Sequence, residues 1–382
     1  GYGETGMAHL LEHLIFKGTP SHPDIPKELT ERGARANGGT SYDRTNYYET
    51  FPSSEDNLAW AISLEADRMI NSFISAEDLE SEMTVVRNEM ESGENNPMRI
   101  LRERVQSTSY LWHNYGQSII GARSDVENVP IERLKSFYKK YYQPDNAVLV
   151  IAGKFDEEKA KNLIIGEFGA IPAPDRTGSN RIYPTYTQDP SQDGERTVTL
   201  RRKGDTQFVM ASYHVPPGSH EEFPAIDIMN HALSAPPSGR LHRALVETGL
   251  AANVAASAPQ LREAGLSLVF AEVRKDRDLD VVWDVMQTTI YDVARGESLI
   301  TEEEVERAKA YYLNSLELMF NDSRSTALQL SWWVALGDWR LLFLYRDGLE
   351  TVTKDDVNRV ASKYLKPQNS TVGFFIPTEQ PD

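Results

Sequence analysis

The sequence has 382 residues and no cysteine. Disulfide bonds are therefore excluded, and any metal ion must be held by His, Asp or Glu side chains.

The sequence has fewer basic than acidic residues, with 40 Lys and Arg against 57 Asp and Glu and a formal net charge of −17. Such an excess of negative charge argues against nucleic acid or an anionic membrane surface as a partner. The sequence also has no apolar run of membrane-spanning length.

The length exceeds what one domain usually contains, so we expect two domains. Residues 172–196 are rich in Pro, Gly, Asp, Ser and Thr without an apolar period, which is typical of a linker. We therefore predict a first domain over 1–171 and a second over 197–382. No secretory signal is recognisable, but the chain opens at Gly1 rather than Met, and we expect its natural N-terminus to precede this residue.

The two halves of the sequence resemble each other. In residues 131–151 and 354–375, an amphipathic helix ends at a Tyr and is followed by Pro, Asn and an apolar strand. The segments that begin at Ile74 and Ile300 both place a capping Ser or Thr before an acidic first turn. Two matches at a nearly constant offset predict a duplicated α+β domain.

Apolar periodicity and turn residues predict a mixture of strands and long helices without regular βαβ alternation, so the expected fold class is α+β. Helices are expected over 6–16, 55–73, 76–92, 97–109, 130–142, 221–234, 239–248, 278–295, 302–320, 324–336 and 353–365. Strands are expected over 39–51, 146–153, 197–203, 206–214, 252–258, 265–274 and 370–376.

The segment Met7–Phe16 contains the pattern His-x-x-Glu-His, formed by His9, Glu12 and His13. Thr5 is expected to cap this segment as a helix, and positions i, i+3 and i+4 of a helix lie on one face. Two imidazoles four residues apart can bind one Zn²⁺, and a carboxylate beside them can take a proton from a zinc-bound water. The alternative, the same residues without a metal, would bury polar groups without partners on an apolar helix.

A catalytic zinc needs a third protein ligand and an open position for water. The acidic helix from Asp78 to Glu91 offers Glu82 and Glu89, which lie two turns apart on one face. Spacing alone does not choose between these two and the many other acidic residues.

The segment GMAHLLEHLIFKGT resembles the M16 family of zinc peptidases, which includes pitrilysin, insulinase and mitochondrial processing peptidase. In that family the third ligand is a Glu on a later helix, with another functional Glu seven residues before it, and Glu89 and Glu82 match this pair. The resemblance implies that His9, His13 and Glu89 bind one Zn²⁺ per chain. It also implies that Glu12 is the general base and that Glu82 supports the site.

Residues 33–51, GARANGGTSYDRTNYYETF, also resemble the family. They imply a strand edge that lines the substrate cleft, with Asn37, Gly39 and Thr40 contacting the peptide. The resemblance further implies that the chain is one half of a clamshell of homologous domains, which closes around short, unstructured peptides.

The chain departs from the family in two places. Strands that usually precede the zinc helix are absent. In the second domain, an Arg and a later Tyr that often contact substrate are replaced by Leu245 and Ala252. We therefore expect a hetero-oligomer with a related subunit that bears the Arg/Tyr pair and lacks the zinc motif. The alternative is that the chain is the first half of a longer one.

The predicted function is that of a zinc endopeptidase subunit. The alternative from another class is a non-catalytic peptide-binding or assembly subunit. A third reading, a dehydrogenase, rests only on the glycines of residues 1–6. The segment DRTNYYETFP looks most like bacterial members, many of which are exported, and so favours the periplasm over the cytoplasm.

Overall fold

The computed structural model describes residues 3–184 and 188–379. Contacts divide the chain into two compact units that interleave in sequence, and strands mix with helices in both, as the α+β class predicts. The first unit consists of Gly1–Glu91, Ser118–Tyr186 and Asp322–Val334, and the second of Ser92–Gln117, Thr187–Asn321 and Ala335–Asp382. The consecutive domains 1–171 and 197–382 stay a prediction. No helix in the described ranges is long and apolar enough to cross a membrane.

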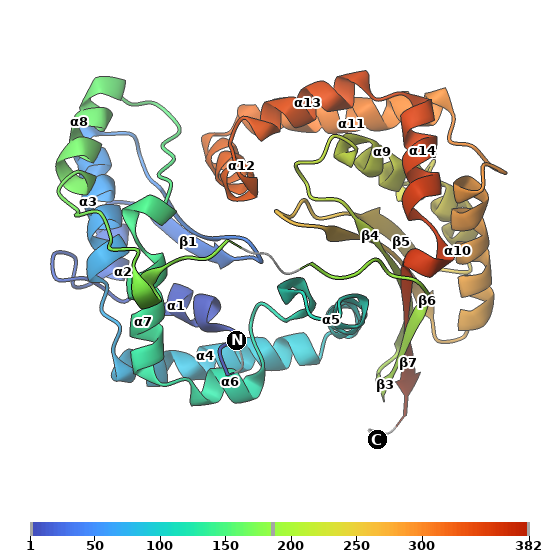
Figure 1. Cartoon of the computed structure of the whole chain (residues 1–382), viewed down its shortest axis with the longest axis horizontal. Helices are drawn as coiled ribbons and strands as arrows, with labels where there is room; N and C mark the ends of the chain where they lie inside the picture. Colours follow the sequence, from blue (N-terminus) through green and yellow to red (C-terminus); the bar gives the residue numbers. More distant parts are fainter. Residues whose placement is uncertain (1–2, 185–187, 380–382) are drawn as a thin grey trace. The chain divides into compact units, whose positions relative to one another are not determined.

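The first unit combines a two-stranded antiparallel sheet with helices (Figure 1). The strands are β1 (Arg35–Thr40) and β2 (Thr45–Thr50). The helices are α1 (Met7–Ile15), α2 (Ile25–Glu31), α3 (Glu55–Asn71), α6 (Arg123–Asn128), α7 (Ile131–Tyr141) and α8 (Glu157–Phe168), with most of α4 (Ala76–Glu94) and α12 (Ser323–Leu336). The single strand predicted over 39–51 was therefore wrong, because the chain turns between Thr40 and Thr45 and pairs with itself.

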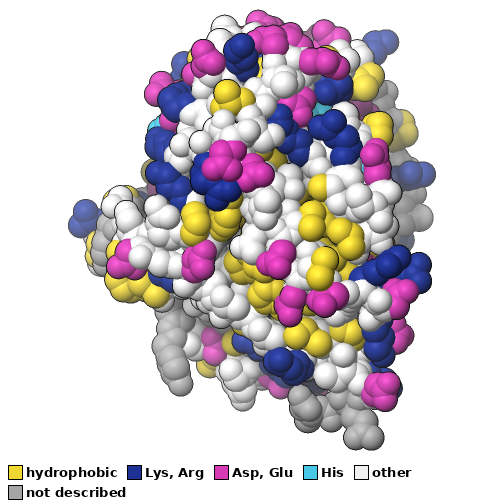
Figure 2. Space-filling model, turned by 90° about the vertical axis from the view of Figure 1, so that its right-hand side faces the viewer, with side chains coloured by type: hydrophobic (Ala, Val, Ile, Leu, Met, Phe, Trp, Pro, Cys, Tyr) yellow, Lys and Arg dark blue, Asp and Glu magenta, His cyan; other side chains and the backbone are white. Residues whose placement is uncertain are grey.

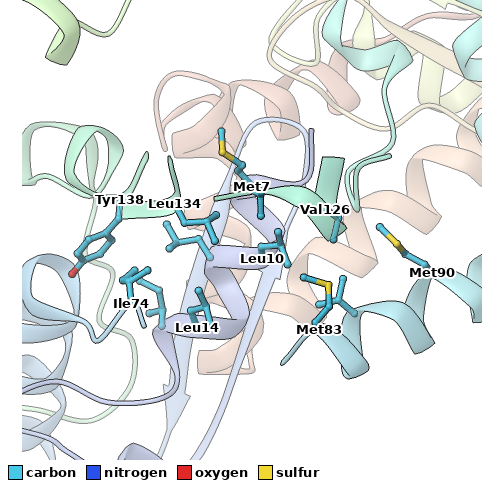
Figure 3. Close-up of a cluster of buried hydrophobic side chains, with 13 residues drawn as sticks. Met7, Leu10, Leu14, Ile74, Met83, Met90, Val126, Leu134 and Tyr138 are labelled. Carbon is cyan, nitrogen blue, oxygen red and sulfur yellow. The ribbon is translucent and has the colours of Figure 1, made fainter. Parts of the chain in front are cut away.

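The core of this unit gathers around α1 (Figure 3). The apolar side chains of this helix are fully or almost fully buried: Leu10, Leu11, Leu14 and Ile15. They share one cluster with side chains from α4, α6 and α7: Met83, Val86, Met90, Val126, Leu134 and Tyr138. Three neighbouring helices thus hold the apolar side of α1.

The start of α1 differs from the prediction. Gly6, not Thr5, is the N-cap, in a left-handed conformation with φ of 82° that suits glycine. The Thr5 hydroxyl donates to Asp125 Oδ2 at 2.6 Å and accepts from the Ala122 N–H at 2.9 Å. Thr5 therefore ties the entry of α1 to α6 instead of capping the helix.

The second unit contains a five-stranded sheet in the order β3-β7-β4-β6-β5. The strands are β3 (Arg196–Lys203), β4 (Thr206–Val215), β5 (Asn253–Ser257), β6 (Gly265–Arg274) and β7 (Ser370–Thr378). Among the described strand pairs of this sheet, β3–β7 is parallel and the other three are antiparallel. The helices are α5 (Pro97–Ser109), α9 (Phe223–Ser234), α10 (Leu279–Ala294), α11 (Glu302–Phe320), α13 (Leu341–Thr351) and α14 (Lys354–Tyr364).

Helix α5 packs on the sheet of the second unit at β3, β4 and β7. Its approach to β7 requires glycine, because a Cβ at Gly373 would lie 2.3 Å from Val105 Cγ2. Helices α10 and α14 lie beside the same sheet (Figure 1).

On the face shown in Figure 2, acidic, basic and hydrophobic side chains are interspersed, so the negative charge is not concentrated there.

The predicted internal repeat is visible at the ends of α7 and α14. Asn146 Nδ2 donates to the Tyr141 carbonyl at 2.9 Å, and Asn369 Nδ2 donates to the Tyr364 carbonyl at 2.9 Å. In both places a short 3₁₀ turn over the Pro-x-Asn segment separates the helix from the next segment. Ser75 and Thr301 also cap α4 and α11 as predicted.

The repeat fails after this turn. Residues 370–378 form β7, whereas the strand predicted over 146–153 was wrong. This segment has no partner strand in the described ranges, and Val148 is 63% exposed.

The helix predicted over 239–248 contains a π-helical turn at His242–Val246. Four helices were not predicted: α2, α6, α8 and α13.

A carboxyl group is buried in the core of the second unit. Asp227 of α9 is 7% exposed. Tyr345 Oη donates to its Oδ2 at 2.6 Å, and Gln260 Nε2 donates to the same atom at 3.3 Å. Burial raises the pKa of Asp227 from 3.8 to about 7, although these two hydrogen bonds act to lower it. The folded protein therefore retains a proton that the unfolded chain loses above pH 4 or so.

We expect Asp227→Asn to stabilise the protein at neutral pH but not at low pH. Folding raises the pKa of Asp227. The stabilisation of the folded protein that comes from its bound proton is therefore complete below the unfolded pKa of 3.8 and is lost as the pH rises through the folded pKa of about 7. The free energy of unfolding of the variant should exceed that of the wild type by an amount that grows between these pH values, up to about 4 kcal/mol. Urea unfolding at a series of pH values measures this difference. Asp284→Asn, at an exposed position of α10, is the control, and a pH-independent difference for Asp227→Asn would contradict the expectation.

Candidate metal centre

Helix α1 presents three polar side chains on the side opposite its buried leucines. His9, Glu12 and His13 are partly exposed, in contrast to Leu10 and Leu14. The rings of His9 and His13 lie edge to face with centroids 4.9 Å apart. The predicted helical spacing therefore does bring both imidazoles together.

Glu89 of α4 completes a cluster with the two histidines. Its Oε2 lies 3.4 Å from His9 Nε2 and 3.8 Å from His13 Nε2. In the described parts of the chain, these residues form the one group of three His, Asp or Glu side chains whose ligand atoms all lie within 4.8 Å of one another. Of the two glutamates that the spacing of α4 offered, Glu89 is the one that joins the histidines.

The donor set fits zinc. Two imidazole nitrogens and one carboxylate oxygen are ligands of catalytic zinc sites, which leave a further position open. Tetrahedral ligands at usual zinc distances lie roughly 3.3 Å from one another. The separations of 3.4 and 3.8 Å between Glu89 Oε2 and the two histidine Nε2 atoms are close to this value, and all three ligand atoms lie within 4.8 Å of one another.

Glu82 lies behind His13. Its Oε2 is 3.2 Å from His13 Nδ1, and because a carboxylate only accepts, this contact assigns the proton to Nδ1. The lone pair of Nε2 is then directed to the side of Glu89. A carboxylate that orients a ligating histidine in this way is a common feature of metal sites.

Lys17 is a residue that the sequence analysis missed. Its Nζ lies 2.5 Å from Glu82 Oε1. Burial would raise the pKa of Glu82, but hydrogen bonds from Lys17 and His13 outweigh burial and lower it. The signal that could have found Lys17 is its position four residues after His13, just beyond the end of α1 at Ile15.

The three residues predicted to bind substrate lie on β1. Asn37 is exposed, and its Oδ1 accepts from the Gly38 N–H at 2.9 Å. Gly39 pairs with Asn46 of β2. Thr40 donates its hydroxyl proton to Glu12 Oε2 at 2.6 Å, so its side chain is directed to α1. Within the described strands, β1 has a partner on one edge only.

A buried charge network supports the hairpin of β1 and β2. Arg68 of α3 is 1% exposed and pairs with Glu65 and, at 2.8 Å, with Glu49 of β2. Its guanidinium also lies over the rings of Phe16 and Tyr47. Burial alone would lower the pKa of Arg68, but the two glutamates outweigh burial and raise it. Arg68 therefore stays charged and links α3, β2 and the end of α1.

Comparison with known proteins identifies relatives over almost the whole chain. The family model described as "Insulinase (Peptidase family M16)" matches residues 3–123, and "Peptidase M16 inactive domain" matches residues 128–312. The cluster of His9, His13 and Glu89 lies within the first match.

Individual relatives agree with the family models. "Zinc protease PqqE" of Helicobacter pylori is 28% identical over 98% of this chain and 84% of its own length. "Probable mitochondrial-processing peptidase subunit beta" of Schizosaccharomyces pombe is 26% identical over 94% of this chain and 80% of its own. A crystal structure of a protease from Helicobacter pylori matches with a TM-score of 0.91 at 27% identity, covering 98% of this chain and 90% of the other.

Arg68→Met should destabilise the protein strongly, because it leaves the carboxyl groups of Glu49 and Glu65 without the buried guanidinium that pairs with them. We expect a loss of about 3–5 kcal/mol in the free energy of unfolding, measured by urea denaturation and circular dichroism. Arg87→Met is the control, because the Arg87–Glu127 pair is largely exposed and such pairs contribute at most about 1 kcal/mol. Equal losses in the two variants would contradict a structural role for the buried network.

Proposed function

This chain belongs to the M16 family of peptidases, and on that premise we propose that it is a zinc-dependent endopeptidase subunit. His9, His13 and Glu89 bind one Zn²⁺, and Glu12 is the general base. The observation that carries the proposal is the convergence of the three ligand atoms within 4.8 Å of one another. The names of relatives described as zinc proteases support it.

The chemistry follows from the positions of the side chains. Zinc, when bound, supplies Lewis acidity for polarising a carbonyl and activating a water molecule. Glu12 stands on the same helix face, one turn from His9, and its carboxylate takes a proton from the attacking water and delivers it to the leaving amine. Glu82 holds His13 in the tautomer that directs Nε2 to the cluster.

The substrate is a short peptide in an extended conformation. The open edge of β1 provides backbone N–H and C=O groups that an added strand can pair with. Pairing through the backbone gives weak sequence preference, and it requires an unfolded substrate. Asn37 and Gly39 are the residues of β1 that we assign to peptide contact.

A partner is needed to complete the site. Leu245, at the position where the family resemblance implies an Arg, is buried and apolar, and Ala252, at the position of the implied Tyr, has no polar side chain. We assign the missing contacts to an M16-like subunit that bears the Arg/Tyr pair and lacks the zinc motif. A second half of the same polypeptide would supply the Arg/Tyr pair equally well.

Glu12→Gln should abolish most peptide cleavage without loss of zinc. Removing a general base costs a factor of about 10² to 10⁴ in rate. The measurement is cleavage of a quenched, unstructured peptide by the zinc-loaded chain, alone and with candidate partner halves, beside zinc content by mass spectrometry. Glu80→Gln, exposed on α4, is the control. Zinc binding by the wild type without cleavage in any pairing would favour a non-catalytic peptide-binding subunit.

Glu82→Ala should weaken zinc binding, because His13 loses the acceptor that orients its ring. Loss of such an orienting partner lowers metal affinity by about 10-fold to 100-fold. Competition with a chromophoric chelator measures the zinc dissociation constant of the full chain. Glu80→Ala on the exposed side of the same helix controls for the loss of one negative charge. Equal affinities of the two variants would show that Glu82 does not support the metal site.

A further inference from the structure

The general base is held from a second element of the fold. Thr40 of β1 donates its hydroxyl proton to Glu12 Oε2 at 2.6 Å, a short distance for a hydrogen bond to a charged acceptor. Both side chains are partly buried. Because α1 and β1 are separate elements, this contact fixes the carboxylate relative to the strand as well as to its own helix.

The hairpin in turn holds Thr40. Thr40 pairs with Thr45 across the hairpin, and their hydroxyl oxygens lie 3.2 Å apart. Two residues earlier, Gly38 lies against the same carboxylate, since a Cβ built there would be 3.1 Å from Glu12 Oε1. The absence of a side chain at Gly38 therefore keeps Oε1 uncrowded while Thr40 holds Oε2.

We infer that Thr40 is a positioning residue for Glu12, and not a substrate contact as its place on β1 suggested from sequence. The inference rests on the proposed function. With Oε2 held by the hydroxyl, Oε1 is the oxygen that accepts the proton of the water and returns it to the leaving amine. A glutamate side chain has three rotatable bonds, so an anchor at one oxygen limits the orientations in which the other meets water.

The test separates positioning from substrate binding by kinetics. Thr40→Val keeps the shape but removes the hydroxyl, and a hydrogen bond to a charged group lost in this way should lower kcat by about 10-fold to 100-fold. KM should stay within about threefold, because the substrate contacts are unchanged. Thr40→Ser should restore kcat to within about threefold of wild type. Thr50→Val, at the exposed far end of the hairpin, should behave as wild type.

Two further readouts do not depend on activity. The zinc dissociation constants of Thr40→Val and the wild type should agree within about twofold, since the Thr40 hydroxyl contacts Glu12 and Thr45, neither of which is a proposed ligand. In crystal structures of the full zinc-loaded chain, the Glu12 carboxylate should lie on the Thr40 hydroxyl in the wild type and adopt other rotamers in Thr40→Val.

Several results would overturn the inference: a raised KM at unchanged kcat, no rescue by Thr40→Ser, or a Glu12 carboxylate away from Thr40 in the wild-type crystal structure. A wild-type chain that binds zinc but cleaves no peptide, alone or with any partner half, would instead refute the proposed function. In that case the crystal structures still decide whether Thr40 positions Glu12.

Discussion

The site depends on the burial of one side of α1. Four aliphatic side chains of this helix are at most 1% exposed: Leu10, Leu11, Leu14 and Ile15. Burying each contributes about 1.5–3 kcal/mol, so a rotation of the helix that exposed this side would cost several times the stabilisation from any one polar contact. The directions of His9, Glu12 and His13 are therefore set by the packing of their apolar neighbours, before any metal is bound.

The same core also positions Glu89. Met83, Val86 and Met90 of α4 belong to the cluster that buries α1, and Met90 adjoins Glu89 in sequence. Fixing the rotation and register of α4 against α1 brings Glu89 to the two histidines and Glu82 behind His13. One hydrophobic cluster thus assembles groups that lie far apart in the sequence, which explains how a group of partly exposed polar side chains can be preorganised.

Sequence reasoning succeeded for the long helices, their caps and their side-chain spacing, missed four other helices, and failed where a distant partner is the determinant. The helical spacing of His9 and His13 and the caps of α4 and α11 depend on neighbours within a few residues, and the structure agrees with them. A strand exists only with a partner, so the apolar segment over 146–153 was mistaken for one. Glu89 was selected by resemblance and not by physics. The contacts of Lys17 and Thr40 cross between elements. The spacing of Lys17 from His13 hints at a role for Lys17, but no local pattern identifies Glu82 as its partner or Glu12 as the partner of Thr40.

The two glutamates beside the cluster are held by different kinds of donor. Glu82 contacts the ammonium group of Lys17, which balances its charge and favours a fixed anion that orients His13. Glu12 is held by the neutral hydroxyl of Thr40, which directs one oxygen without cancelling the charge. A general base must gain and release a proton in each cycle, whereas an orienting carboxylate must stay ionised throughout. The choice of Lys for one and Thr for the other therefore matches the separate roles proposed for the two side chains.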